Sequence, residues 1–150
     1  MTAYEVRALA GEVLESARRG EVELVVAGGG EPLRCCLRDA AEGEELMLFN
    51  YEPPLPPSPY REMGAVFAHA SACDGAAPGG DYPADWVGRP QVLRAYDERG
   101  WIHPATRVHD GSDPAGAIAK VLGEPGVVRV HSRNVAYGCY MFEVVPVPAI

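Results

Sequence analysis

Lysine is almost absent from this chain of 150 residues, and acidic residues outnumber basic ones. Lys120 is the only lysine among 13 basic residues, which stand against 21 acidic residues, and the formal net charge is −8. This balance argues against nucleic acid and against anionic membrane surfaces as partners. The remaining cations are arginines, which are weakly hydrated and fork onto carboxylates or phosphates, so single arginines can still hold anions.

Long hydrophobic runs are also missing. No stretch approaches the roughly 20 apolar residues that a membrane-spanning helix needs, and the opening residues 1–20 are acidic and amphipathic, without the apolar centre of a signal peptide. We therefore expect a cytoplasmic protein without a membrane partner. The length and the 47% share of hydrophobic residues predict one globular domain spanning residues 1–150.

Cysteine is sparse and shows no CxxC spacing. The four cysteines are Cys35, Cys36, Cys73 and Cys139. In a cytoplasmic protein we expect them to be reduced and unbridged. If Cys35 and Cys36 lie on a strand, their side chains point to opposite faces, which makes them poor partners for each other.

The N-terminal half mixes one helical pattern with strand patterns. Apolar residues at three- and four-residue spacing predict a helix over 4–19. Strands are predicted over 21–27 and 33–37, with the triple glycine 28–30 between them as the turn of a possible hairpin. The glycines do not form a phosphate loop, because Glu31-Pro32 and a second strand follow them instead of a helix.

Further along, strands are predicted over 44–51 and 65–70, separated by five prolines within 52–59. This proline-rich segment favours an extended polyproline course across the surface. Its alternative role is as a ligand for an aromatic groove of another protein. Residues 74–90, rich in Gly, Pro, Ala and Asp, form the best candidate for a mobile lid.

The C-terminal half contains the clearest local signals. Strands are predicted over 91–96 and over 101–108, where Pro104 interrupts the pattern. A helix is predicted over 113–122, because Asp113 can cap it, Pro114 fits its first position and Gly123 can end it. Two apolar runs around the polar connection 132–138 predict a hairpin over 127–147.

Together these elements predict an α+β fold: a single compact domain with a mostly antiparallel, curved sheet of about five to seven strands and two helices. The loops 74–90 and 132–138 are expected to enclose a pocket.

Four stretches resemble, in order and spacing, the signature of a bacterial family catalogued as domain of unknown function 1203. They are PLRCCLRDAAEGEELMLFNYEP (32–53), SPYREMGAVFAH (58–69), LRAYDERGWI (93–102) and VHSRNVAYGC (130–139). The similarity covers about residues 32–145. It implies one small α+β domain and names no reaction.

The polar connection of the hairpin carries the first candidate site. A Cys–His pair can activate a thiolate, and His131 and Cys139 could approach each other at the end of the hairpin. The alternative is that Cys139 is a small core residue, since free cysteine is among the most buried residue types. Tyr137 lies between them in the chain, and we group the three as candidate catalytic residues.

A zinc site is the second possibility. His69 and Cys73 form an H-x3-C pair that His131 and Cys139 could complete. These spacings match no known zinc finger or ribbon, so ordinary buried residues are favoured, and we expect no metal and no cofactor.

Arginines on strands form the third group. Arg94 and Tyr96 share a strand face because they are two residues apart. Each arginine holds either an internal carboxylate, the favoured alternative, or the carboxylate or phosphate of a ligand. For Asn134, the alternative is a structural role at a left-handed turn position. The predicted ligand-binding residues are Arg94, Tyr96, Arg133, Asn134 and His69.

The leading functional hypothesis is a small-molecule-binding protein that serves as an accessory enzyme of bacterial metabolism. His131 would act as acid and base, since an unperturbed imidazole titrates near neutral pH. Arg94 or Arg133 would hold an anionic group, and His131 and Arg94 are expected to face a common cavity. The rival is a non-catalytic interaction module that uses the proline-rich segment and the loops.

Overall fold

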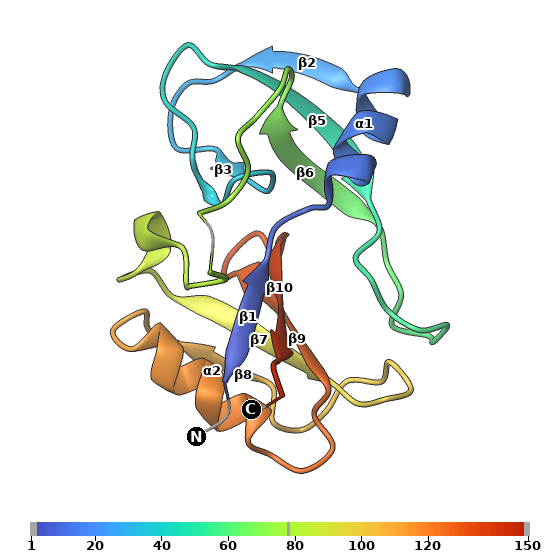
Figure 1. Cartoon of the computed structure of the whole chain (residues 1–150), viewed down its shortest axis with the longest axis vertical. Helices are drawn as coiled ribbons and strands as arrows, with labels where there is room; N and C mark the ends of the chain where they lie inside the picture. Colours follow the sequence, from blue (N-terminus) through green and yellow to red (C-terminus); the bar gives the residue numbers. More distant parts are fainter. Residues whose placement is uncertain (1–2, 78, 149–150) are drawn as a thin grey trace.

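The fold comprises two five-stranded sheets, one above the other in the view of Figure 1. The structure is a computed structural model, which describes residues 3–77 and 79–148. The α+β class, the mostly antiparallel pairing and the two helices are confirmed. The expectation of one sheet is wrong, since the strands divide between two sheets that each have their own hydrophobic cluster.

The lower sheet has the strand order β1-β10-β9-β7-β8. Its strands are β1 (Tyr4–Arg7), β7 (Gln91–Tyr96), β8 (Arg107–His109), β9 (Arg129–Asn134) and β10 (Tyr140–Pro146). Its neighbouring strands all pair antiparallel within the described residues, and the predicted C-terminal hairpin is confirmed as the pair of β9 and β10 at its centre.

The upper sheet has the strand order β2-β5-β6-β3-β4. Its strands are β2 (Glu23–Val26), β3 (Pro32–Leu33), β4 (Arg38–Asp39), β5 (Glu45–Tyr51) and β6 (Gly64–His69). One pairing is parallel, the bridge of Leu33 in β3 with Phe67 in β6.

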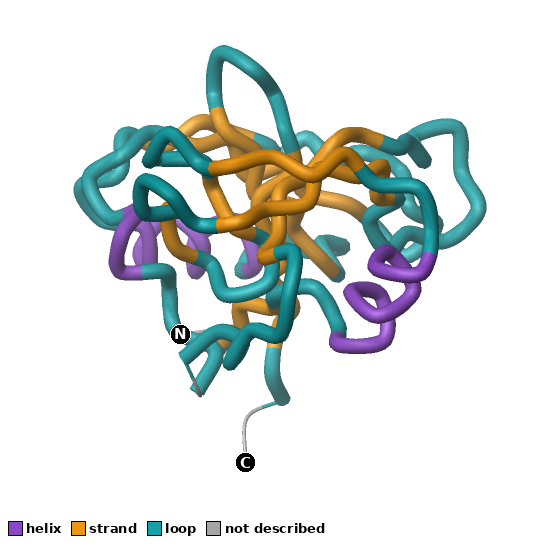
Figure 2. Tube along the Cα trace, turned by 90° about the horizontal axis from the view of Figure 1, so that it is seen from above, coloured by secondary structure: helices purple, strands orange, loops and turns teal. Residues whose placement is uncertain are grey.

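The two α-helices lie at the sides of the strands, as the view from above shows (Figure 2). Helix α1 (Gly11–Arg19) adds Leu14 to the upper cluster, and α2 (Pro114–Leu122) adds Ile118 to the lower one. A short 3-10 helix, η1 (Ala84–Trp86), lies within the loop that precedes β7. The predicted α2 is confirmed, including the Asp113 side chain that accepts from Gly116 N at 3.1 Å.

The N-terminal helix is shorter than predicted. Residues 4–7 form β1, which pairs with β10 in the register Val6–Val144, and the helix begins only at Gly11. The apolar spacing of this stretch suits a helix, but pairing with an otherwise open sheet edge satisfies its backbone groups and buries Val6 in the lower cluster.

The hairpin expected around the triple glycine is also wrong. β2 pairs with β5, and β3 pairs with β4 and β6. The glycines form a bend in which the backbone N–H groups of Gly28 and Gly29 both donate to the Glu31 carboxylate at 2.9 Å. These hydrogen bonds stabilise the charged carboxylate and so lower the pKa of Glu31.

The strand predicted over 101–108 is largely absent. Ile102 makes one isolated bridge with Tyr96, and regular pairing resumes at β8 with Arg107. Pro104 lies between them and lacks the N–H that a ladder needs, which accounts for the interruption.

The proline-rich segment 52–63 leaves β5 and descends beside the lower sheet (Figure 1). Pro53 is buried, Arg129 donates to the Pro54 carbonyl at 3.1 Å, and Ser58 Oγ donates to the Gly100 carbonyl at 2.9 Å. The extended surface course that the prolines predict is therefore packed against the lower half of the molecule.

Arg34 joins the two sheets. It is only 2% exposed and lies in the turn between β3 and β4. Its N–H donates to Phe67 O at 2.9 Å in β6, its carbonyl accepts from Leu9 N at 3.1 Å, and its Nε donates to Tyr140 O at 2.7 Å in β10. Burial lowers the pKa of Arg34 to about 10, so it still carries its charge at neutral pH.

Within the described residues, neither helix has the length and the apolar character that crossing a bilayer requires.

Replacing Arg34 with alanine tests this junction. The Tyr140 carbonyl loses its donor inside the molecule, so we expect the free energy of unfolding to fall by about 1–3 kcal/mol in urea denaturation. Arg19→Ala, which removes an exposed arginine at the end of α1, serves as the control and should leave the urea midpoint nearly unchanged. Equal midpoints for the two variants would contradict the role of Arg34.

Candidate functional site

A tight turn separates β3 from β4 and carries two adjacent cysteines. Leu37 in this turn has a φ of 56°, and its N–H donates to Leu33 O at 2.9 Å. The predicted strand over 33–37 is therefore wrong beyond Leu33, because the chain reverses there. The expectation that Cys35 and Cys36 point apart fails with it, since their Sγ atoms are 3.8 Å from each other.

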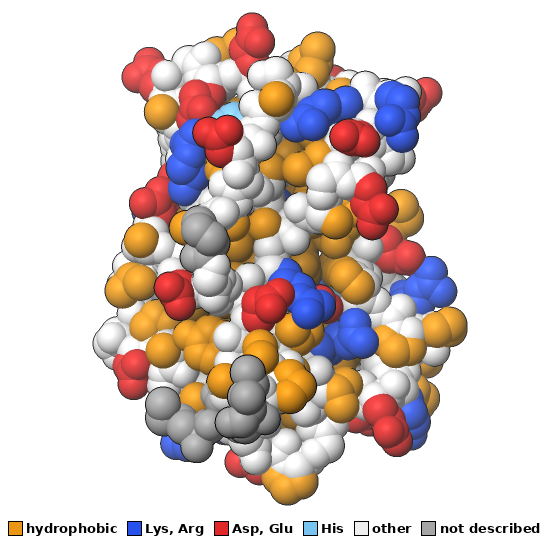
Figure 3. All heavy atoms as spheres, in the orientation of Figure 1, with side chains coloured by type: hydrophobic (Ala, Val, Ile, Leu, Met, Phe, Trp, Pro, Cys, Tyr) orange, Lys and Arg blue, Asp and Glu red, His pale blue; other side chains and the backbone are white. Residues whose placement is uncertain are grey.

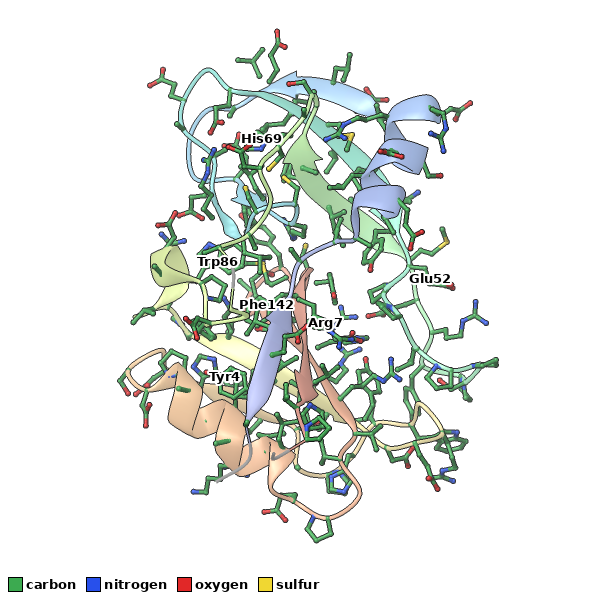
Figure 4. All side chains as sticks on the ribbon, viewed as in Figure 1. Tyr4, Arg7, Glu52, His69, Trp86 and Phe142 are labelled. Atoms are coloured by element: carbon green, nitrogen blue, oxygen red, sulfur yellow. The ribbon has the colours of Figure 1, made fainter. Side chains whose placement is uncertain are left out.

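The end of β6 brings a histidine to these thiols. The parallel bridge between Leu33 and Phe67 aligns the two strands, and His69 is the last residue of β6. Its Nδ1 is 3.5 Å from Cys35 Sγ and 4.0 Å from Cys36 Sγ. Figure 4 shows sulfur atoms beside the labelled His69.

Cys73 follows β6 by four residues and completes the group. One ligand atom from each of the residues Cys35, Cys36, His69 and Cys73 lies within 4.8 Å of all the others. We call these four residues the Cys3His cluster. Cys35 is buried, and the other three are partly buried.

A carboxylate and a guanidinium flank the Cys3His cluster. Glu44 accepts from His69 Nε2 at 2.7 Å and from both terminal nitrogens of Arg38 at 3.0 Å. Arg38 holds the pKa of Glu44 well below its usual range, so the carboxylate is charged. The hydrogen bond between the thiols of Cys35 and Cys36 lowers the pKa of Cys35 to about 5 and raises the pKa of Cys36.

A cavity of about 430 Å³ opens beside the cluster. Its lining includes Cys36, Arg38, His69, Cys73 and Asp74. The thiols of Cys36 and Cys73 and the imidazole of His69 are therefore accessible to a solute from one side, whereas Cys35 is buried behind them.

The zinc quartet considered from the sequence is not assembled. His69 and Cys73 lie in the upper half, whereas His131 and Cys139 belong to the hairpin of β9 and β10 in the lower sheet. The two residues that join His69 and Cys73 instead are Cys35 and Cys36.

A row of polar side chains crosses the lower sheet. Arg7, Glu143, His131 and Arg94 are register partners on four adjacent strands. Because directly opposed residues point to the same face, all four share the face opposite the hydrophobic cluster that α2 covers. His131 and Arg94 therefore point to the same side of the sheet.

His131 is enclosed within this row. It is 1% exposed, its ring centroid lies 4.8 Å from that of Tyr96 and 5.3 Å from that of Tyr140, and its Nε2 is 3.3 Å from Glu143. Cys139 Sγ makes its hydrogen bond with the Tyr137 carbonyl at 4.0 Å. The expected contact between His131 and Cys139 is not among the hydrogen bonds of the described residues.

A second cavity, of about 240 Å³, lies where the two halves meet, and we call it the junction cavity. Figure 3 shows apolar side chains in the hollow between the halves. Twelve residues from β5, β6, the loop before β6 and the hairpin line it: Tyr51, Pro53, Glu62, Met63, Gly64, Ala65, Val66, Arg133, Tyr137, Gly138, Cys139 and Tyr140. Three of the predicted site residues, Arg133, Tyr137 and Cys139, are thus brought together.

Arg133 is the charged group buried deepest in this cavity wall, with a side chain only 9% exposed. It donates to the Gly138 carbonyl at 2.9 Å and pairs with Glu62, whose side chain is 45% exposed and also accepts from Arg94 at 3.3 Å. Desolvation lowers the pKa of Arg133 without removing its charge at neutral pH.

The other predicted binding residues have structural contacts. Tyr96 packs against His131, and the Asn134 side chain accepts from Cys139 N at 2.8 Å, which shapes the hairpin connection. His69 belongs to the Cys3His cluster and does not line the junction cavity.

Sequence reasoning missed Cys35, Cys36 and Glu62. The H-x3-C spacing of His69 and Cys73 is visible in the sequence. The position of Cys35 and Cys36 beside them depends on the left-handed conformation of Leu37 and on the parallel bridge between β3 and β6, which no local pattern indicates. Glu62 lies near the end of the proline-rich segment 52–63, and its pairing with Arg133 depends on how that segment packs.

The fold and these sites define a small α+β protein of two sheets with a cavity of mixed polar and apolar lining at their junction. The chain belongs to the family described as "Protein of unknown function (DUF1203)", whose profile matches residues 30–145. No curated protein and no solved structure matches the chain.

The enclosure of His131 predicts a structural contribution. His131→Ala leaves the buried Glu143 without one of its donors, so we expect the free energy of unfolding to fall by about 1–3 kcal/mol, measured in urea. Tyr137→Ala changes an 88% exposed residue of the same hairpin and should leave stability nearly unchanged. A His131→Ala protein as stable as wild type would show that the imidazole is not structural.

Proposed function

We propose that the protein binds a small anionic metabolite in the junction cavity. The observation that carries the proposal is Arg133, a buried arginine in the wall of a cavity. Desolvated guanidinium groups bind carboxylates and phosphates strongly, because the fork geometry allows two parallel charge-assisted hydrogen bonds.

The size of the cavity limits the ligand. About 240 Å³ corresponds to roughly eight water molecules at about 30 Å³ each. Pockets that bind drug-sized ligands have volumes of about 300–1,000 Å³. The cavity therefore suits a small carboxylic acid or phosphate ester better than a nucleotide.

Two phenols add neutral hydrogen-bond donors to the cavity wall. Burial raises the pKa of Tyr51 to about 12 and raises that of Tyr140 well above its usual value. Both hydroxyls stay protonated at neutral pH and can donate to ligand oxygens. Their ring centroids lie 5.5 Å apart, one on β5 and one on β10, so the two rings pack against each other across the junction. A ligand that reached both hydroxyls would contact both sheets.

Glu62 supplies the internal anion in the absence of ligand. It lies in the proline-rich segment 52–63 and pairs with Arg94 and Arg133 while nearly half exposed. An anionic ligand on Arg133 would take the place of this carboxylate.

The role of accessory enzyme in bacterial metabolism, including biosynthesis, stays a prediction. Cys139 and Tyr137 line the junction cavity and are the side chains placed to react with its contents. His131 does not line it and faces Glu143, so the acid–base role proposed for it from the sequence has less support.

The rival interaction module has less support as well. The segment 52–63 packs on the lower half through Pro53 and the Pro54 carbonyl, and that packing occupies part of its surface.

A cytoplasmic location is supported by the four cysteines, all of which are free, since unpaired thiols persist in reducing compartments.

Three variants test the proposal with inorganic phosphate and succinate as probes in calorimetric titration. Arg133→Gln removes the charge that holds the ligand, and the loss of a charge-assisted bond of about 1.5–3 kcal/mol should weaken binding at least tenfold. Glu62→Gln removes the internal competitor and should strengthen binding. Arg61→Gln, which alters an arginine of the same segment that pairs with Glu52, should leave binding unchanged.

Binding of either probe that is insensitive to Arg133→Gln would contradict the proposal, as would the absence of binding by both probes. Thermal melting of Arg133→Gln checks that the variant is folded before its affinity is interpreted.

A further inference from the structure

We propose that Cys35, Cys36, Cys73 and His69 form a zinc site. Three sulfur atoms and one imidazole nitrogen lie within 4.8 Å of one another, and they come from two separate segments of the chain. Such a donor set selects thiophilic ions, because thiolate ligands favour Zn²⁺ and disfavour Mg²⁺ and Ca²⁺. This site replaces the sequence-based expectation that no metal is bound.

Two of the distances between donor atoms match a tetrahedral ion, and all the donor atoms lie within 4.8 Å of one another. With Zn–S of about 2.3 Å and Zn–N of about 2.0 Å, tetrahedral angles place two sulfurs about 3.8 Å apart and a sulfur and nitrogen about 3.5 Å apart. The Cys35 and Cys36 sulfurs are 3.8 Å apart, and Cys35 Sγ is 3.5 Å from His69 Nδ1. The distance from Cys36 Sγ to Nδ1, 4.0 Å, needs a shift of about half an ångström to match.

The imidazole is oriented as metal-binding histidines usually are. Nδ1 faces the sulfurs, while Nε2 lies 2.7 Å from the Glu44 carboxylate. A carboxylate on the far nitrogen fixes the tautomer that leaves the near nitrogen free to bind the ion, and it makes that nitrogen more basic. Arg38 forks onto the same carboxylate and holds it in place.

Backbone donors support the charge of the sulfurs. His69 N donates to Cys35 Sγ at 3.3 Å, and Gly75 N donates to Cys73 Sγ at 3.4 Å. Zinc binds thiolates, so its entry displaces the remaining thiol protons into solvent and leaves a site of net charge −1 from three thiolates and one Zn²⁺. Arg38 provides a neighbouring positive charge.

The site has an entry path and a structural consequence. The cavity of about 430 Å³ is lined by Cys36, His69 and Cys73, so an ion can reach these three donors from solvent, with the buried Cys35 behind them. Four protein ligands form a closed set, which is typical of structural zinc. The ion would join the turn between β3 and β4 to the chain after β6, where Arg18 already donates to Ser71 O at 2.8 Å.

This inference is independent of the junction cavity. None of the four proposed ligands lines that cavity, and Cys139, the fourth cysteine, lines it without belonging to the cluster. Cys139→Ser is therefore a matched control for loss of a thiol outside the zinc site.

The test is metal titration of the chelator-treated, reduced full-length chain. Zinc should bind with one ion per chain, measured against a chromophoric chelator, and cobalt should give the absorption bands of a tetrahedral thiolate complex. Zinc should also raise the melting temperature, because the ion binds the folded state. Cys139→Ser should retain the stoichiometry of one.

Two further variants separate ligation from folding. Cys36→Ser and Cys73→Ser should each lose the tetrahedral cobalt spectrum and weaken zinc binding at least 100-fold, with circular dichroism reporting whether the metal-free fold is retained. Glu44→Gln should weaken binding by about 10- to 100-fold, as expected for a residue that orients a ligand.

The proposal is overturned if the wild-type chain binds less than one equivalent of zinc, or if cobalt bound to it gives an octahedral spectrum. It is also overturned if folded Cys36→Ser and Cys73→Ser proteins bind zinc as wild type does.

Discussion

The turn between β3 and β4 depends on one buried arginine. Arg34 donates through its backbone to β6 and through its side chain to β10, and its carbonyl accepts from the segment before α1. A buried guanidinium is stable only when it is hydrogen-bonded, so these contacts fix the turn relative to three segments. The neighbouring residues Cys35 and Cys36 are held beside His69 as a consequence.

The same arginine lies between two sites of different chemistry. On one side, the Cys3His cluster presents soft sulfur donors with a charged carboxylate behind the imidazole. On the other, the carbonyl that Arg34 binds belongs to Tyr140, a wall residue of the junction cavity. A zinc ion in the cluster would stiffen the turn that carries Arg34, and this would stabilise the junction where we propose that an anionic metabolite binds.

The sequence predicted the elements that local signals specify. Asp113, Pro114 and Gly123 mark α2 by capping chemistry, and the hairpin 127–147 is marked by its apolar runs. The predictions that were wrong concern structure that depends on the way the chain folds back on itself. Residues 4–7 form a strand because they pair with the edge of β10. Cys35 and Cys36 lie close together because the chain reverses its direction at Leu37. Of the residues that line the junction cavity, Arg133, Tyr137 and Cys139 were among the predicted site residues because they are close in sequence, whereas Glu62 was not. The pair Cys35–Cys36 of the Cys3His cluster was not predicted either.

Anomalous diffraction at the zinc absorption edge, from crystals grown with zinc, tests most directly the claim that this turn delivers two thiolates to His69. The account predicts one peak per chain, about 2.3 Å from the sulfurs of Cys35, Cys36 and Cys73 and about 2.0 Å from His69 Nδ1. A map with no peak at this position, or with the two neighbouring sulfurs pointing away from His69, would contradict it.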